Sequence, residues 1–308
     1  MVATTLFVVG ACGSPVHDVR PAAGFRSLPP TASSAPPPTS SAPPPATSSA
    51  PPPPATPACA DTGFDCDLQT RFAAADAYVD GRPGTAGIVV HDLRTGAEWH
   101  NGHAEDLTWT ASTIKLGMVV DLYTRQRAGE ISLTAEDRSL IHAMLHTSDD
   151  NAADTLWFRY AGADHMSFND NFPHYGLTSL VPKAGFTKFY PYWGFQKCTP
   201  EDLDRLMTYV LTKLPADERS SIVEELRSVD PIQQWGVWGA GPAARPGNKD
   251  GWSEEQGGWV MNTVGFVGEG ERYVLTVMNN LRGEGGYDTG RATVTHVAEL
   301  IFGGYFPG

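Results

Sequence analysis

The feature that most limits how this chain can fold is residues 27–60, a stretch without a single Asp, Glu, Lys or Arg. Within it, residues 29–57 hold 13 of the 25 prolines, and the sequence SSAPPP begins at Ser33, Ser40 and Ser48. Such a repeat cannot bury an apolar core and favours extended polyproline II. We therefore predict that residues 13–60 form a disordered Pro/Ser/Ala-rich tether and that the folded domain occupies residues 61–308.

The segment before the tether has features of an export signal. Residues 6–12 read LFVVGAC, a short apolar run with small residues before Cys12. This pattern resembles the lipobox of bacterial lipoproteins, in which the cysteine carries the lipid. We predict that residues 1–12 are a signal segment, that Cys12 is lipidated, and that the protein is anchored to the outer face of the cell membrane.

Charge and hydropathy exclude two classes of protein. The 308 residues include 22 Lys and Arg against 35 Asp and Glu, a formal net charge of −13. This acidic balance lacks the basic surface that nucleic-acid binding requires. No apolar run reaches the ~20 residues of a spanning helix. We expect no nucleic-acid partner, and membrane contact through the lipid anchor only.

The cysteines also fit an exported protein. If Cys12 carries lipid, Cys59, Cys66 and Cys198 remain, so one disulfide can form and one thiol is left over. The pair Cys59–Cys66 closes the shortest loop and is favoured. The sequence leaves both pairings with Cys198 open.

Hydrophobic spacing predicts an α+β domain. Alternating apolar residues predict strands in residues 86–92 and 97–100 and again in 257–267 and 271–279. Helical spacing predicts helices in residues 67–78, 112–127, 134–145, 151–160, 200–214, 217–229 and 289–302. Since strands occur near both chain ends, we predict one antiparallel sheet built from both ends, flanked by helices and with an inserted all-α lobe.

A serine and a lysine stand about one helical turn apart at the start of the segment 112–127. Ser112 and Lys115 therefore lie on the same face of a helix. A partly desolvated lysine can accept the proton of a serine hydroxyl and so activate it as a nucleophile. The alternative is a helix cap at Ser112 beside a solvated Lys115, and this pair taken alone favours that alternative.

Two more short motifs follow in the chain. The sequence HTSDDN occupies residues 146–151, between two predicted helices, and NKDGW occupies residues 248–252, before the late hairpin. Each motif alone would pass as a helix cap or a turn. The order Ser-x-x-Lys, Ser-Asp-Asp, Lys-Asp-Gly is far more specific than any one of them.

Together these motifs resemble the S-x-x-K, S-D-N and K-T-G motifs of the class A β-lactamase and penicillin-binding-protein superfamily of serine acyl-enzymes. The resemblance covers about residues 61–308 and implies a β-lactamase/transpeptidase-like fold. It implies that Ser112 is the nucleophile, Lys115 its base, Ser148 the proton shuttle to the leaving group, and Lys249 the electrostatic partner of Ser148 and the substrate.

The same resemblance places Asp150, Asp250 and Gly251 at substrate-binding positions. The superfamily forms its oxyanion hole from the backbone N–H of the nucleophile and one from the strand after the third motif. Here these groups would belong to Ser112 and to a residue near positions 253–257.

Three departures from the superfamily bear on substrate choice. Asp150 stands where the family has an Asn that donates to a substrate amide, and Asp250 replaces the hydroxyl residue that meets a substrate carboxylate. We expect both changes to disfavour penicillins. Residues 181–198 contain no Asp or Glu, so the deacylation base that class A enzymes supply from that region is missing, and efficient β-lactam hydrolysis is not expected.

Other candidate sites are weaker. His142 and His146 are spaced i, i+4, but no carboxylate accompanies them in the sequence, so two histidines without a metal are favoured. We expect no cofactor and no metal. A group of aromatic residues could be core or a stacking wall at the edge of the site; its members are Phe189, Tyr190, Tyr192, Trp193, Trp235 and Trp238.

Two functions from different classes are therefore open. The favoured one is an exported, lipid-anchored serine hydrolase that transfers an acyl group from an amide or ester, with a small molecule or a cell-wall peptide as substrate. The alternative is a catalytically retired domain that binds a cell-wall fragment or a partner protein. We expect a monomer in either case.

Overall fold

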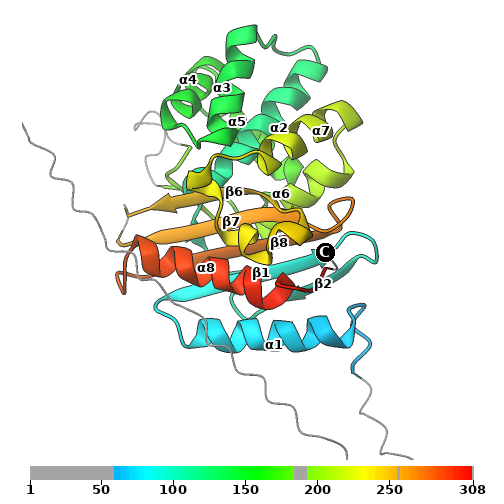
Figure 1. Ribbon diagram of the computed structural model, residues 1–308. Coiled ribbons are helices and arrows are strands. Elements are labelled where there is room, and N and C mark those ends of the chain that lie inside the picture. The colour runs from blue at the N-terminus through cyan, green and yellow to red at the C-terminus, as the bar shows by residue number, and fades with distance from the viewer. Residues whose placement is uncertain (1–58, 184–192, 255–256, 307–308) are drawn as a thin grey trace, which may run out of the picture. The chain divides into compact units, whose positions relative to one another are not determined.

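Strands from both ends of the domain pair in one five-stranded antiparallel sheet, with the order β2-β1-β8-β7-β6 (Figure 1). The strands are β1 (Thr85–Asp92), β2 (Ala97–His100), β6 (Gly247–Ser253), β7 (Val260–Val267) and β8 (Tyr273–Asn280). β1 pairs with β8 along its full length, which joins the N-terminal hairpin to the C-terminal strands. The predicted α+β architecture is confirmed.

The structure is a computed structural model, and it describes residues 59–183, 193–254 and 257–306. These residues belong to one unit, Ala55–Gly308. The predicted signal segment, Cys12 and nearly all of the predicted tether lie outside the described residues.

Helices lie on both sides of this sheet. α1 (Cys66–Asp80) and α8 (Tyr287–Phe302) cover one face (Figure 1). The segment between β2 and β6 carries the inserted helices, which are α2 (Ile114–Arg127), α3 (Ala135–His146), α4 (Asp150–Tyr160), α5 (Ser167–Asn171), α6 (Pro200–Thr212) and α7 (Ala216–Arg227). Each helix predicted from the sequence is present, with ends that differ by a few residues; the short α5 had no predicted counterpart.

The sheet is buried on both faces, which gives the domain two apolar cores. Val274 and Met278 of β8 pack into the core of the helical lobe, whereas Leu275 and Val277 pack against α1 and α8. Successive side chains of a strand point to opposite faces. A strand with two buried faces therefore reads as a nearly continuous apolar run, as β7 and β8 do.

Cys59 and Cys66 form a disulfide, as the sequence favoured. The bond joins the first described residue to the first residue of α1. Cys198 is a free, fully buried thiol, and burial raises the pKa of this thiol well above its usual value. A buried neutral thiol is an ordinary small core residue.

A second, small sheet was not predicted. It has the order β3-β5-β4 and consists of β3 (Thr108–Trp109), β4 (Val181–Pro182) and β5 (Gln196–Cys198). Such short strands leave too few residues for an alternating pattern to stand out. The backbone N–H of Thr110 donates to the carbonyl of Gln196 (2.9 Å), so this sheet holds the chain just before Ser112.

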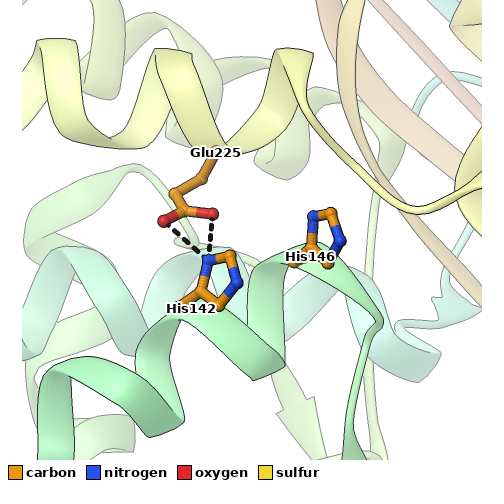
Figure 2. Close-up of side chains that lie close together, drawn as sticks. All are labelled: His142, His146 and Glu225. Carbon is orange, nitrogen blue, oxygen red and sulfur yellow. Dashed lines mark hydrogen bonds and ion pairs between the residues drawn. The ribbon is translucent and has the colours of Figure 1, made fainter.

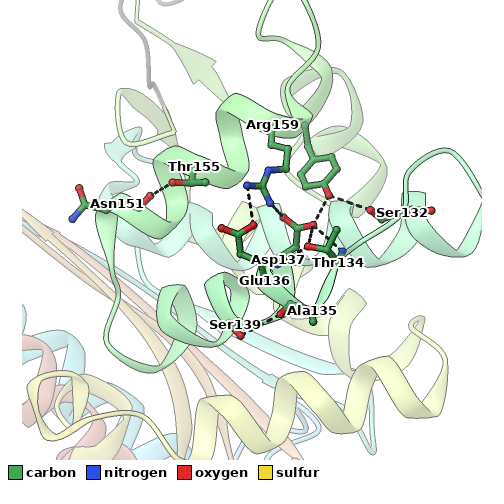
Figure 3. A network of polar contacts seen from close by, with 10 residues as sticks. Ser132, Thr134, Ala135, Glu136, Asp137, Ser139, Asn151, Thr155 and Arg159 are labelled. Carbon is green, nitrogen blue, oxygen red and sulfur yellow. Dashed lines mark hydrogen bonds and ion pairs between the residues drawn. The ribbon is translucent and has the colours of Figure 1, made fainter.

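A polar network around Asp137, on the first turn of α3, connects α3 to the end of α4 in the helical lobe (Figure 3). Thr134 and Asp137 form a capping box. The Asp137 carboxylate also accepts hydrogen bonds from Tyr160 (2.7 Å) and from Arg159. Burial alone would raise the pKa of Asp137, but the hydrogen bonds from Thr134, Tyr160 and Arg159 hold that pKa below its usual value.

We predict that Asp137→Ala destabilises the domain by about 2–3 kcal/mol, because the cap is lost and the hydrogen bonds from Tyr160 and Arg159 to the buried carboxylate are lost with it. Glu136→Ala is the matched control: its carboxylate is 71% exposed and pairs with the same arginine at 3.4 Å, so it should cost less than about 1 kcal/mol. Urea unfolding at pH 7 measures both.

The pH dependence of the same variants gives a second readout. A carboxyl whose folded pKa is lowered stabilises the fold above its unfolded pKa of ~3.9, and this contribution disappears as the pH falls through the folded pKa. The difference between the wild type and Asp137→Ala should therefore shrink in acid. Equal stability of the wild type and Asp137→Ala at pH 7 would contradict a stabilising role for the Asp137 carboxylate.

Candidate active site

Ser112 lies in a strained turn immediately before α2. It is the middle residue of the 3₁₀ turn η1 (Ala111–Thr113), and it is 8% exposed. Ala111 has a φ of 45°, a left-handed conformation that costs an L-residue ~1 kcal/mol or more. Neither η1 nor α2 has a side-chain cap hydrogen bond. The capping alternative for Ser112 is therefore not what the structure shows.

A side chain of strand β7 forms hydrogen bonds with the backbone of this turn. The Asn262 side chain donates to the carbonyl of Trp109 (2.7 Å) and to the carbonyl of Thr110 (3.2 Å), and the Thr113 hydroxyl donates to the same Thr110 carbonyl (2.7 Å). These bonds fix the backbone on both sides of Ser112. Sequence reasoning missed Asn262, because only the pairing of β6 with β7 places this residue next to the first motif.

Gly251 of β6 packs directly on the backbone of the same turn. A Cβ atom at this position would lie 2.9 Å from the backbone nitrogen of Ser112 and 2.7 Å from that of Thr113. Only glycine fits this close approach. The edge of the third motif is thus in contact with the first motif.

The second motif forms the turn between α3 and α4. Asp149 is the N-cap of α4, and its side chain accepts from the backbone N–H of Ala152 (2.8 Å). Ser148 is 7% exposed and has a φ of 59°. Because the neighbouring aspartate provides the cap, the Ser148 hydroxyl is not needed for capping and can serve the site.

Lys115 joins the first motif to the second. Its ammonium is fully buried and donates to the Ser148 carbonyl (2.7 Å), the Ser148 hydroxyl (3.4 Å) and the Asp150 carboxylate (2.6 Å). It also lies 4.3 Å from the centre of the Trp193 ring. Burial lowers the pKa of Lys115 below its usual value, although the charge of Asp150 opposes this shift.

Lys249, from the third motif, completes the group. It is fully buried and donates to the Gln233 side chain and to the Asp250 carbonyl (2.8 Å). Burial lowers the pKa of Lys249 well below its usual value, and the nearby charge of Lys115 lowers it further. Two lysines with lowered pKa values at one site are typical of catalytic positions.

Gln233 is a connecting residue that sequence reasoning missed. It lies in η4 (Pro231–Gln233), and its side-chain amide donates to the carbonyls of Leu145 (2.7 Å) and His146 (2.9 Å) while its oxygen accepts from Lys249. It therefore ties the third motif to the end of α3. No short motif marks Gln233, since its role depends entirely on long-range packing.

Among the predicted site residues that the structure describes, Asp250 is the one whose side chain does not lie with the others. It is fully buried and accepts from the Asn248 side chain (2.5 Å), and burial raises its pKa well above the usual value. Because Lys249 faces the site, the next residue of β6 faces the opposite side of the sheet. This placement corrects the expectation that Asp250 lies beside a bound acyl donor.

Comparison with known proteins finds similarity in sequence and in fold. The model of the Beta-lactamase enzyme family matches residues 70–138, a stretch that includes Ser112 and Lys115. Relatives named "Putative lipoprotein LppW" occur in Mycobacterium tuberculosis and Mycobacterium bovis. Each is 28% identical over 260 residues, which span 81% of this chain and 79% of the relative.

Solved structures share the fold. An ancestral class A β-lactamase matches with a TM-score of 0.61 at 18% identity, over 77% of this chain and 99% of its own. PBP-A matches with a TM-score of 0.63 at 19% identity, over 77% and 96%. A β-lactamase from Xanthomonas campestris gives 0.62 at 19%, also over 77% and 96%. This domain has a β-lactamase-like fold.

Asp150 is the departure from the superfamily motifs that lies at the site of the β-lactamase-like domain. The Asp150 side chain is 71% exposed at the same time as it pairs with the buried Lys115. A carboxylate at this position therefore has two effects, because it stabilises the ammonium form of Lys115 and also presents a negative charge to solvent.

No helix in the described part of the chain is long and apolar enough to cross a membrane.

The aromatic residues singled out in the sequence have separate roles. Trp235 is buried in the core beside α8, and the Trp238 indole donates to Asn248 (2.9 Å). Trp193 lies at the site, where its indole donates to Asp154 (2.7 Å). Phe189, Tyr190 and Tyr192 lie outside the described residues, as does half of the segment 181–198 that lacks a carboxylate.

We predict that Gly251→Ala destabilises the β-lactamase-like domain by about 1–3 kcal/mol, since the new methyl group meets backbone atoms that cannot move aside cheaply. Gly102→Ala is the matched control, because a Cβ atom there meets nothing within 4 Å. Thermal unfolding compares the two. Equal melting temperatures would show that β6 does not press on the Ser112 turn.

Proposed function

We propose that this protein is an exported, lipid-anchored serine acyl-enzyme that acts on an amide or ester acyl donor. The observation that carries the proposal is the convergence of three distant segments on one group of side chains. Lys115 contacts Ser148 of the second motif, and Gly251 of the third motif packs on the backbone of Ser112. Capping and turn formation do not require such convergence.

In the proposed reaction the Ser112 oxygen attacks the carbonyl carbon of the donor while the neutral form of Lys115 takes the hydroxyl proton. The backbone N–H of Ser112 stabilises the oxyanion. The bond to the leaving amine or alcohol then breaks, and the leaving group receives a proton from Ser148, which Lys115 resupplies. Attack by water on the acyl-enzyme releases the acid and restores Ser112.

Asp150 determines when Lys115 can act as a base. The carboxylate, 2.6 Å from the ammonium, favours the protonated form of the lysine and so slows the activation of Ser112. A donor that brings its own cationic group could pair with the exposed Asp150 and release Lys115. We therefore propose amine-bearing acyl donors, such as cell-wall peptides with a free amine, over penicillins, whose carboxylate would meet the same negative charge.

A second function is favoured by the same ion pair. A domain that keeps Lys115 permanently charged would bind a cell-wall fragment or a partner protein without acylation. A single-residue mutant of PBP-A has been solved as an acyl-enzyme with penicillin G, which supports the enzyme proposal by analogy of fold alone. Covalent labelling distinguishes the two functions.

The lipid anchor is part of the proposal. The name of the mycobacterial relatives contains the word lipoprotein, and residues 9–12 of this chain read VGAC before a charge-free tether. In this proposal the protein is exported and the lipid on Cys12 anchors it to the outer face of the membrane. The tether alone connects the domain to this anchor.

We predict that an activated fluorophosphonate adds one equivalent of mass to the wild-type protein and none to Ser112→Ala or Lys115→Met. The first variant should remain within about 1 kcal/mol of wild-type stability. Ser139→Ala is the matched control, because its hydroxyl only bonds its own helix at Ala135. Intact-mass spectrometry reads the result. Labelling that persists in Ser112→Ala would exclude the proposed nucleophile, and an unlabelled wild type would favour the binding function.

We further predict that Asp150→Asn raises the rate of labelling by a neutral fluorophosphonate at pH 7 about 10-fold. Without the carboxylate the pKa of Lys115 falls, so more of it is neutral. Asp170→Asn, an exposed position on α5, controls for the change in net charge. A rate in Asp150→Asn equal to that of wild type would show that the ion pair does not limit activation.

A further inference from the structure

A group of two histidines and a carboxylate joins α3 to α7 on the helical lobe. His142 and His146 lie on successive turns at the end of α3, and Glu225 faces them from α7 (Figure 2). One potential ligand atom from each residue lies within 4.8 Å of the others. Sequence reasoning missed Glu225, because this residue lies far from the histidines in the chain.

The geometry of the three side chains is that of a nearly assembled metal site. The Glu225 oxygens lie 2.8 and 3.0 Å from Nδ1 of His142. The two imidazole rings are stacked, with centres 5.0 Å apart and planes 16° from parallel. Ligand atoms around a zinc ion at ~2.0–2.2 Å are about 3.3 Å apart, so small side-chain rotations would close the site.

A second observation points to a missing ligand. Nδ1 of His146 is buried, and within the described residues it has no hydrogen-bond partner. A buried polar atom without a partner costs free energy unless something binds it. His142 is 56% exposed, so an ion can reach the group from solvent.

We propose that His142, His146 and Glu225 bind a divalent transition-metal ion of the zinc class, with water as a fourth ligand. Neutral imidazole favours such ions over magnesium and calcium, which prefer oxygen ligands. The ion would bridge α3 and α7. This site is separate from the acyl chemistry and does not depend on the proposed function.

A metal ion bound here would stabilise the C-terminal end of α3, the helix that leads to the second motif. The carbonyl of His146 accepts from the backbone N–H of Asp230 (2.9 Å) and from the Gln233 side chain (2.9 Å). Both donors follow α7 in the chain. Metal binding would stabilise the same junction from the other side, and the free energy of binding would add to the stability of the fold.

The test uses tag-free protein, zinc chloride and two readouts, calorimetric titration and thermal unfolding. At 100 times the dissociation constant, zinc should raise the melting temperature of the wild type by roughly 5–8 °C, and magnesium should not. His142→Ala and His146→Ala should each weaken zinc binding about 10-fold or more, and Glu225→Gln should weaken it also.

Two control variants make the test specific. Glu224→Gln changes an exposed neighbour of Glu225, and His91→Ala removes the only imidazole of another group, His91, Glu98 and Asp204. Zinc binding should be unchanged in both. The proposal is overturned if zinc neither binds nor stabilises the wild type, if both α3 variants bind zinc like the wild type, or if His91→Ala is the variant that loses binding.

Discussion

The ammonium group of Lys115 has no exposed surface, and the arrangement of the site depends on how this charge is accommodated. Removing a cation from water is costly, so the protein must either supply acceptors or let the group lose its proton. Here it does both in part. The second motif supplies acceptors at Ser148 and Asp150, and burial still lowers the pKa of the lysine. The balance between these terms determines whether the site is a catalyst or a binding pocket.

The scaffold brings the second and third motifs to the Ser112 turn and to Lys115. The sheet brings β6 onto the Ser112 turn through Gly251, while Gln233 links Lys249 to the end of α3. The strained φ at Ala111 and Ser148 shows that both turns are held by their surroundings, since neither conformation is favourable for the residue itself. Strained turns of this kind are found where function requires a fixed side chain.

Local signals in the sequence were sufficient for the hairpin strands, for the longer helices and for the first and second motifs, but not for the second sheet or for α5. Apolar spacing predicted the hairpins and long helices, because each is wide enough to show its period. The roles of Asp250 and Gln233 were not predictable in the same way. The face that Asp250 occupies depends on the register of β6 with β7, and the partners of Gln233 come from α3. Glu225 is a third case, since only the packing of α7 on α3 places it beside two histidines.

The central claim is that burial lowers the pKa of Lys115 below the ordinary lysine value despite the pairing of its ammonium with Asp150. Carbon-13 NMR of lysine side chains, with Lys115→Met to assign the signal, measures its titration directly. We predict a midpoint below the ordinary lysine value of ~10.4, and a lower midpoint still in Asp150→Asn. A Lys115 that titrates at or above the ordinary value would contradict this account and leave the domain without a base for Ser112.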